Sequence, residues 1–594
     1  APLNLIAGQK AKAATAYEAA LKYFTVGCQR LLENSWEMEY DLTFTLHKEK
    51  LEAQYLNTHY EQAERLAPVV LEQAKAVLDK SQVYEIQMQF LIAENQMQAA
   101  ITMGLQVLEL LDISLLDSPP QNLLIDELTD LPEMNDPYKL AGLRILMLLF
   151  SPALIANPPL LPKTAFTMLN ICRQSGNSPL AAFAYGYYGL LLCGDRSDIE
   201  SGYQFGQLAL TVFDKFDAKE LECKVHEVYY DFIVHWKEHA RYSIQPLQEN
   251  IQVGLETGDV EFACYSIIVY CSNLVLIGEP LILVNQKQLS YISLLQNLKQ
   301  EFHLYYAKIW GQLVRNLMEV ESSADKQHLK GELFNEIELL PIFLKTNNLT
   351  SLFCVYLAKN MLSYLFKDYA AAVVNGSKAE EYEPAMSGLM AVSENPFYYS
   401  LALLAQYPIV ESRLQSDYLE KVTVNQHKMS IWAYHAPMNF QHKYDLVEAE
   451  KARVLGQVVE AMTLYEQSIT GARNNGYIQE EALAYELAAE FYLKQGMLEF
   501  ANLYLKNAHY AYQQWGAVAK VKDLEARYPQ ILLQVTVAKP ISSLITATQH
   551  FTPAVSSSES SLSVLDLETV MKASQAIAGC LLYTSDAADD MQCV

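Results

Sequence analysis

Apolar and polar positions recur with helical spacing along most of the chain, and residues 481–517 show the pattern in its simplest form. This segment reads EALAYELAAEFYLKQGMLEFANLYLKNAHYAYQQWGA, two amphipathic stretches separated by a polar turn at Gly496. Ala489 and Ala501 lie on opposite sides of the turn, where only a small side chain lets two helices cross closely. The pattern therefore predicts a helical hairpin whose apolar face a single hairpin cannot bury.

A turn followed by a small residue recurs at compatible spacing elsewhere in the chain. The intervals Ala63 to Ala100 and Ala461 to Ala501 are 37 and 40 residues, within the ~34–47 of helical-hairpin repeats. We therefore expect an all-α fold, an α-solenoid of tetratricopeptide-like (TPR-like) antiparallel helix pairs in a right-handed superhelix over residues 1–530. The alanines expected at the buried hairpin crossings are Ala63, Ala263, Ala372, Ala461 and Ala501.

The periodic pattern ends near residue 530. Residues 531–563 are rich in Ser, Thr and Pro, which is typical of a linker, and 564–579 regain helical spacing as the start of a connecting helix. Residues 580–594, CLLYTSDAADDMQCV, resemble a translated sequencing adapter, so we expect an artefact there. The chain also begins without methionine, and we expect an internal fragment of a longer polypeptide.

Composition narrows the possible partners. The formal net charge of −26 disfavours binding to nucleic acid or to an anionic membrane, because both need clustered Lys and Arg. The most apolar stretch, 145–156, is short for a membrane span and contains Pro152. The nine cysteines form no C-x-x-C pair, and Cys264 and Cys271 share an apolar face, so we expect reduced, buried thiols in a cytoplasmic protein.

One motif suggests metal chemistry. The residues HWKEH, from His235 to His239, fit the H-x-x-E-H pattern in which two histidines one helical turn apart hold zinc and the glutamate acts as a base. A third ligand is not evident among the scattered carboxylates that follow. The alternative is a repeat helix in which Trp236 is packed and the histidines lie at the edge of a groove. His226 is one more helical histidine and adds little to the zinc hypothesis. We therefore assign no metal site. The carboxylates in question are Glu249, Glu256 and Glu261.

Two further features have structural explanations. Asp259, in the turn TGDVE, is expected to cap the helix that follows it. Glu450 and Arg453 are expected to pair on a solvated helix surface. The sequence contains no phosphate-binding loop and no Ser-His-Asp or Cys-His motif, so we assign no catalytic or cofactor-binding residue.

Over nearly its whole length the chain resembles the helical-repeat region of large bacterial signalling kinases. These proteins join a serine/threonine kinase, a P-loop ATPase, the helical repeats, a GAF sensor domain and a histidine kinase. The resemblance implies that residues 564–579 lead towards a missing GAF domain, and that ATP and magnesium bind only in domains outside this chain. It lies in GQKAKAATAYEAALKYFTVG, LHKEKLEAQYLNTHYEQAE, YDFIVHWKEHARYSIQPLQENIQVGLETGDVEFACYS, IWAYHAPMNFQHKYDLVEAEKARVLGQ, EEALAYELAAEFYL, NAHYAYQQWGAVAKVKDLEARYP and LDLETVMKASQAIAG.

Three functions compete at this point. The first is a non-catalytic scaffold within such a kinase, with a protein, a peptide or the neighbouring ATPase or GAF domain in its groove. The second is a free-standing adaptor of the same fold. The third is a zinc peptidase that uses His235, Glu238 and His239.

Overall fold

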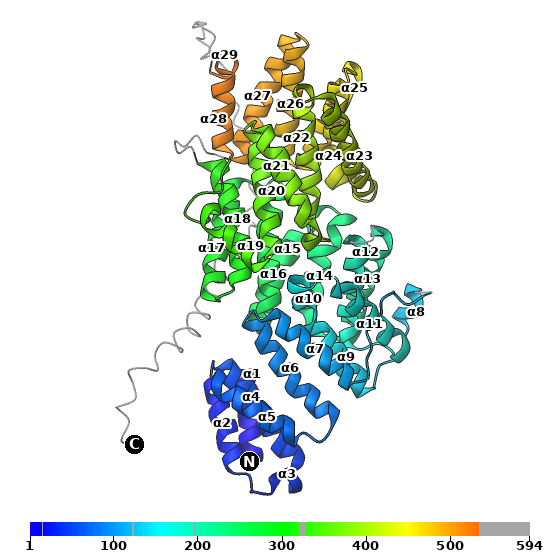
Figure 1. The fold of residues 1–594 in the computed structure, drawn as a ribbon, viewed down its shortest axis with the longest axis vertical. Helices are drawn as coiled ribbons and strands as arrows, with labels where there is room; N and C mark the ends of the chain where they lie inside the picture. Colours follow the sequence, from blue (N-terminus) through cyan, green and yellow to red (C-terminus); the bar gives the residue numbers. More distant parts are fainter. Residues whose placement is uncertain (15, 122–123, 195–197, 320–326, 534–594) are drawn as a thin grey trace, which may run out of the picture. The chain divides into compact units, whose positions relative to one another are not determined.

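The computed structural model describes residues 1–14, 16–121, 124–194, 198–319 and 327–533 (Figure 1). The chain divides into two units, Ala1–Gln534 and Val535–Val594. The predicted linker, connecting helix and adapter-like segment therefore lie outside the described residues, apart from 531–533. The fold described below is that of the first unit.

The described residues form helices joined by turns, which confirms the all-α fold. Two isolated β-bridges, Glu133–Asn177 and Lys330–Asn335, are the extended pairings found in these ranges. The α-helices are α1 (Pro2–Ala13), α2 (Tyr17–Gln29), α3 (Ser35–Met38), α4 (Tyr40–Leu56), α5 (Tyr60–Gln73), α6 (Val77–Ala93), α7 (Met97–Leu110), α8 (Ile125–Thr129), α9 (Pro137–Leu148), α10 (Phe150–Ala156), α11 (Leu160–Ser175), α12 (Pro179–Gly194), α13 (Ile199–Phe216), α14 (Glu222–Phe232), α15 (Ile244–Thr257), α16 (Val260–Leu276), α17 (Leu281–Asn297), α18 (Glu301–Met318), α19 (Glu336–Thr346), α20 (Leu349–Leu365), α21 (Tyr369–Tyr382), α22 (Glu394–Gln406), α23 (Ser412–His435), α24 (Pro437–Val454), α25 (Val458–Asn474), α26 (Ile478–Lys494), α27 (Leu498–Trp515), α28 (Val518–Arg527) and α29 (Pro529–Leu532). The 3-10 turns are η1 (Lys219–Leu221), η2 (Val234–Trp236), η3 (Ala240–Ser243), η4 (Glu383–Met386), η5 (Met390–Ser393) and η6 (Tyr407–Ile409).

Consecutive helices pack as antiparallel hairpins, and successive hairpins stack on one another. Pairs such as α6 with α7, α20 with α21 and α26 with α27 form hairpins, while α16 packs on α18 and α18 on α20. This arrangement is the α-solenoid expected from the spacing of small residues. All five predicted crossing alanines are fully buried, at 0% exposure: Ala63, Ala263, Ala372, Ala461 and Ala501.

Several hairpin turns share one backbone conformation. After α26 the left-handed residue Gly496 (φ +74°) donates its N–H to the carbonyl of Leu493, and the next N–H, from Met497, reaches the carbonyl of Tyr492. These two bonds form a Schellman motif, which satisfies the last carbonyls of a helix. Lys367 (φ +71°) occupies the same position after α20, so the turn does not require glycine.

Several helices are buried on all sides. Every residue from Phe262 to Leu276 in α16 is buried, and so is every residue from Leu180 to Cys193 in α12. A helix that is apolar all round is stable in water only when other helices surround it. The faces that an open solenoid would present as a groove are therefore filled in this part of the chain.

Hairpins that are distant in the sequence also touch. The amide of Gln479 donates to the carbonyl of Leu276 at 2.7 Å, and Arg241 donates to the carbonyl of Gly476 at 2.7 Å. Near the end of the array, α28 packs on α18. In a simple solenoid each repeat contacts only its neighbours. Here hairpins from the middle and the end of the described array are also joined to each other.

The apolar segment around Pro152 is longer in the structure than the stretch 145–156. Helices α9 and α10 together span 20 residues, Pro137–Ala156, and an 18-residue window of this span has a mean hydropathy of 1.7, so by length and composition it could cross a membrane. The break falls at Leu149, and Pro152 lies in the first turn of α10. Since 56% of this window is buried and Leu149 and Phe150 belong to the main core, the segment is packed as a core element.

Candidate interaction groove

The N-terminal hairpins carry an open groove of about 280 Å³. Three helices that follow one another in the stack line it, because α4 packs on α6 and α6 on α9. Its residues are Lys48 and Glu52 from α4, Gln82, Glu85, Ile86 and Gln89 from α6, and Arg144 from α9. The volume is just below the ~300–1,000 Å³ typical of ligand pockets, and the lining is polar.

Helical periodicity explains why these side chains face one another. On α6 the lining residues Gln82, Glu85, Ile86 and Gln89 follow the spacing i, i+3, i+4 and i+7, which is one face of a helix. Ile86 is the buried member of this face. The face contains mainly polar side chains, unlike the inner faces of α12 and α16, so it is left open instead of being covered by another hairpin.

Charges of both signs line the groove. Lys48 donates to Gln82 Oε1 at 2.9 Å, and Arg144 Nε donates to Glu85 Oε2 at 3.1 Å. Burial raises the pKa of Glu85, and Arg144 opposes that effect. Lys12 reaches Glu52 Oε2 at 2.8 Å. The groove thus offers half-buried cations, carboxylates and amides, a set suited to an extended polypeptide that presents several polar groups.

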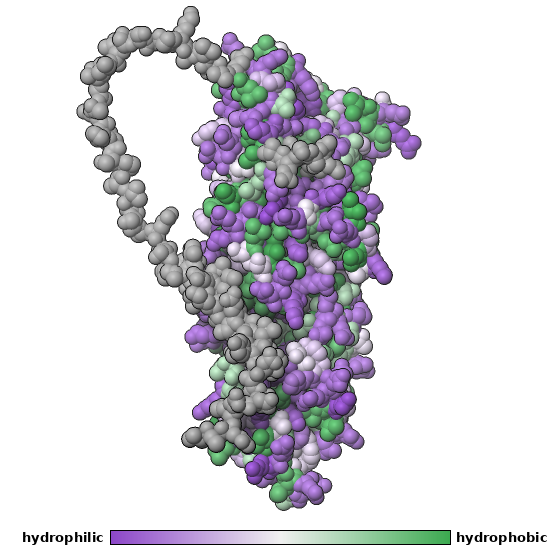
Figure 2. All heavy atoms as spheres, turned by 90° about the vertical axis from the view of Figure 1, so that its left-hand side faces the viewer, coloured by the Kyte–Doolittle hydropathy of each residue, from purple (hydrophilic) through white to green (hydrophobic). Residues whose placement is uncertain are grey.

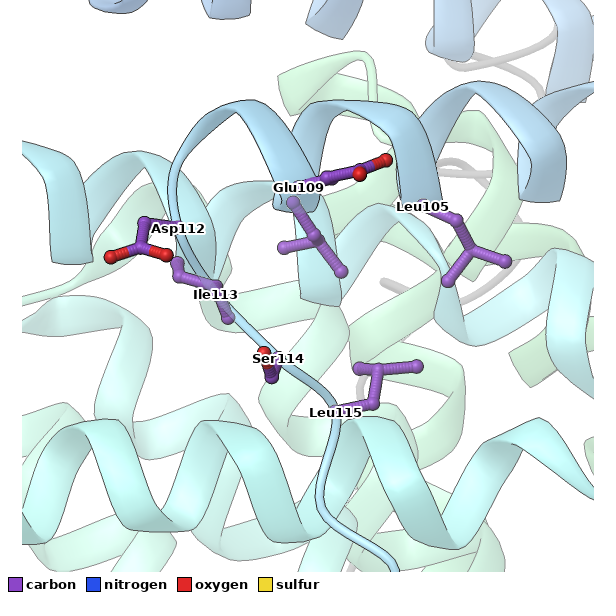
Figure 3. Close-up of a pocket in the computed structure, with 7 residues that line it drawn as sticks. Leu105, Glu109, Asp112, Ile113, Ser114 and Leu115 are labelled. Atoms are coloured by element: carbon purple, nitrogen blue, oxygen red, sulfur yellow. The ribbon is translucent and has the colours of Figure 1, made fainter.

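A second hollow lies at the end of α7 (Figure 3). It encloses about 170 Å³ and is lined by Leu105, Leu108, Glu109, Asp112, Ile113, Ser114 and Leu115. The figure shows Glu109 on the last turn of α7 and Asp112 just after the helix, with Ile113, Ser114 and Leu115 on the chain that follows. It is smaller than the first groove, and no basic side chain lines it.

The zinc motif does not form the predicted helix. Helix α14 ends at Phe232, and His235 lies in the 3-10 turn η2, followed by irregular backbone through His239. The expected spacing of two histidines on one helical face is therefore wrong. Nothing local causes the break, because residues 232–243 contain neither Gly nor Pro; contacts with distant hairpins cause it.

The three motif side chains point to separate surroundings. His235 is fully buried, and burial lowers its pKa to about 3. The carboxylate of Glu238 accepts a hydrogen bond from the hydroxyl of Tyr203. His239 Nδ1 accepts from the backbone N–H of Arg241 at 3.2 Å, so its proton lies on Nε2, which donates to the carbonyl of Asn475 at 3.0 Å. Both nitrogens of His239 are engaged, and neither is available to a metal.

The whole loop is anchored on later helices. Trp236 is buried, donates to the carbonyl of Gly388 at 3.1 Å and packs against Trp432 and Phe440. Asn439 on α24 donates to the carbonyls of His235 and Glu238 at 2.8 and 2.7 Å. The segment is thus a structural junction, with His235 in the core and not at a groove edge. Across the described ranges, no group of three or more His, Cys, Asp and Glu could hold a metal ion.

Asp259 differs from its predicted role. It occupies the N-cap position of α16, but its side chain makes no capping hydrogen bond. Its carboxylate instead pairs with Lys224 on α14, where both side chains are mostly buried. Because an ammonium in the interior needs a counter-charge, this ion pair takes the carboxylate away from the backbone.

Two carboxylates share the interior close to that pair. Glu227 and Asp231 lie one turn apart on α14, at 1% and 0% exposure. Burial raises the pKa of Glu227 to about 8 and that of Asp231 well above its usual range, where the neighbouring carboxylate adds to the effect. Two like charges cannot both ionise there, so the pair retains a proton at neutral pH.

The predicted surface pair Glu450–Arg453 is also buried. The Glu450 side chain is 4% exposed and that of Arg453 is 14% exposed, with the guanidinium Nη2 2.6 Å from the carboxylate. The hydroxyl of Tyr465 donates to the same carboxylate. The spacing was right, but the expected exposure was wrong, because α25 covers this face of α24.

Six of the seven described cysteines are buried and Cys28 is partly buried, and all carry free thiols. Burial raises the pKa of Cys28 to about 11 and that of Cys172 to about 12, and it raises the pKa of Cys264 and Cys271 as well. These groups are therefore protonated thiols with little nucleophilic character.

The face seen in Figure 2 is mostly hydrophilic, with small hydrophobic areas scattered across it.

Comparisons with known proteins give one weak relative. No protein-family model matches the chain. The hybrid signal transduction histidine kinase G of Dictyostelium discoideum is 22% identical over 358 residues, which cover 53% of this chain and 10% of that kinase. The chain thus matches about a tenth of the length of this relative. Yeast Tom70 matches over 89% of this chain and 96% of its own, at 12% identity and a TM-score of 0.19. The fold assignment therefore rests on the helices and turns described above.

Proposed function

We propose that this chain is a non-catalytic scaffold and regulatory segment of a multi-domain serine/threonine and histidine signalling kinase of the bacterial type. In this role the helical repeats mediate contacts with other proteins or with neighbouring domains of the same polypeptide. The observation that carries the proposal is an array of stacked helical hairpins with an open polar groove on α4, α6 and α9. The similarity to part of a hybrid histidine kinase supports the kinase context.

The groove is the proposed contact site. Its partner is a peptide, a protein or the neighbouring ATPase or GAF domain, held by Lys48, Arg144 and the amides of Gln82 and Gln89. Half-buried charged side chains give such contacts specificity and orientation more than raw affinity. The strongly acidic composition argues for a partner that is neither nucleic acid nor membrane, and we place the protein in the cytoplasm.

Catalysis on this proposal belongs to other parts of the parent protein. ATP and magnesium bind in kinase and ATPase domains beyond this chain. The solenoid instead transmits partner binding as a change in the contacts between hairpins.

The test begins with the parent gene. Its sequence on both sides of the region that encodes this chain is expected to encode kinase, ATPase and GAF domains. In the full-length protein, Lys48→Ala with Arg144→Ala is expected to remove cross-links between the groove and its partner and to change autophosphorylation. Lys22→Ala, on the exposed side of α2, serves as the control. A gene that encodes the solenoid alone, or ATP turnover by residues 1–533, would contradict the proposal.

A further inference from the structure

The end of the array is held by a buried cluster of charges. Glu486 on α26 is fully buried and lies within ion-pair distance of three cations from different parts of the chain. Lys520 Nζ is 3.0 Å and Arg527 Nη2 is 2.6 Å from its Oε1, and both come from α28. Lys367, the left-handed residue after α20, is 2.9 Å away.

The cluster contains three cations and three carboxylates, and Glu486 and Lys520 at its centre are fully buried. Burial alone would raise the pKa of Glu486, but its three cations outweigh burial and hold that pKa well below the usual range. Glu490 and Asp523 supply the other two negative charges, at 3.1 and 2.9 Å from Arg527. Lys520 also donates to the carbonyl of Leu365, and the hydroxyl of Tyr512 donates to Glu486 at 2.8 Å.

Apart from these charges, α28 has little to hold it. The helix is 10 residues long, and its buried apolar residues are Ala519, Val521 and Leu524. By contrast, α12 and α16 are 16 and 17 residues long and are buried along nearly their whole length. A buried ion cluster adds little net stability, because desolvation offsets most of the attraction. Removing one of its charges is nevertheless strongly destabilising, because the remaining charges are left buried without a partner.

Helix α28, which carries two of the three cations, contacts helices that are far apart in the sequence. The helix packs on α27, its neighbour in the sequence, and on α18, about 200 residues earlier (Figure 1). Lys520 also donates to the carbonyl of Leu365 at the end of α20, and Lys367 in the following turn pairs with Glu486, the carboxylate that α28 binds. This one short helix therefore bridges the last hairpin and the middle of the array.

We propose that α28 is an ionic latch, a separately releasable helix that closes the array by inserting Lys520 and Arg527 onto Glu486. When the latch is shut, α28 lies against α18 and against α27 of the last hairpin. When it is released, α28 detaches from α18 and from the α20–α21 turn while the hairpins stay folded. The inference does not depend on the proposed kinase context.

Hydrogen–deuterium exchange of the whole chain tests the latch. Arg527→Gln keeps a polar side chain that can donate hydrogen bonds but leaves three carboxylates facing two cations. We expect exchange to rise at least tenfold in 518–532 and in the turn at 366–368, with no change in α4 and α6. Lys367→Gln is expected to give the same pattern from the other side of the cluster.

Two controls separate the outcomes. Lys522→Gln changes an exposed cation on the same helix, which pairs with Glu525 outside the cluster, and exchange is expected to stay as in the native chain. Leu487→Ala, in the buried face of α26, is expected to raise exchange throughout α18–α27. If Arg527→Gln gives this global pattern, α28 is an integral part of the fold and the latch is refuted. Unchanged exchange in 518–532 would show that the cluster does not hold the helix.

Discussion

His239 and Asn475 are 236 positions apart, yet the imidazole of the first donates a hydrogen bond of 3.0 Å to the backbone carbonyl of the second. The bond joins the irregular loop after α14 to the turn between α25 and α26. Together with the bonds from Arg241 to Gly476 and from Gln479 to Leu276, it forms a seam between distant hairpins. The residues that suggested a zinc site are therefore part of this seam.

Asn439 is the residue on which the seam depends most. Its amide donates to the carbonyls of His235 and Glu238 and accepts from the N–H of Ala240 and the hydroxyl of Tyr477. Asn439→Ala leaves these buried groups without partners, and we expect unfolding in urea to show a loss of about 3 kcal/mol. Asn439→Asp is expected to cost more, because it places a negative oxygen against two carbonyls.

Asn474→Ala, in the exposed last turn of α25, is the control for Asn439 and should stay within about 0.5 kcal/mol of the native chain. Equal stability of the Asn439→Ala and Asn474→Ala variants would show that the seam does not bear on stability.

The crossing of α26 and α27 predicts a second effect. Ala501 is fully buried there, and Ala501→Leu forces the two helices apart. We expect a loss of ~1–3 kcal/mol in thermal or urea unfolding. Lys506→Leu, on the exposed face of the same helix, places a leucine at the surface and is expected to be free of that cost. A neutral result at Ala501 would mean that the crossing is looser than described.

Stability should also depend on pH through Glu227. Its pKa rises from an ordinary 4.5 to about 8 in the fold. Between these pH values the folded chain holds a proton that the unfolded chain releases. The stabilisation from this proton is therefore fully present below pH 4.5 and is lost as the pH rises towards 8. The free energy of unfolding falls by up to about 1.4 kcal/mol per pH unit in this range. Glu227→Gln removes this dependence, so the variant should gain stability relative to the native chain between pH 5 and 8.

Urea unfolding at each pH unit from 5 to 8 measures that gain, and Glu220→Gln in the exposed turn η1 is the control. Parallel pH profiles for the native chain and the Glu227→Gln variant would contradict the retained proton.

The geometry of His235, Glu238 and His239 predicts that zinc does not change the thermal stability of the protein. Dialysis against a chelator, or addition of one equivalent of zinc, is expected to leave the thermal midpoint unchanged, because each side chain already has its own place in the seam. A zinc-induced rise of the midpoint that His239→Ala abolishes would restore the metal hypothesis.

The sequence predicted what depends on contacts within a hairpin. Small residues such as Ala461 and Ala501 mark crossings between helices that are neighbours in the chain, so their spacing was sufficient. The turns were harder to recognise where the left-handed residue is Lys299 or Lys367 instead of glycine, because the two Schellman hydrogen bonds impose a conformation that these side chains rarely adopt.

What the sequence could not predict depends on distant partners. The break after Phe232, the pairing of Asp259 with Lys224 and the burial of Glu450 are each decided by another helix and not by local propensity. The groove residues were missed for a different reason. The spacing of Gln82, Glu85 and Gln89 was visible, but an exposed helix face with no partner shows the same pattern.

The seam also restricts how this protein can change in evolution. Ordinary repeat arrays lengthen or shorten by duplicating or deleting a unit, since each unit depends only on its neighbours. Here a hairpin inserted between Arg241 and Gly476 would displace every later unit from its distant partner. The hydrogen bonds from Arg241 to Gly476 and from His239 to Asn475 would then be lost together. The copy number between these points is therefore fixed, and relatives that retain the seam should differ in their loops and in the units outside it.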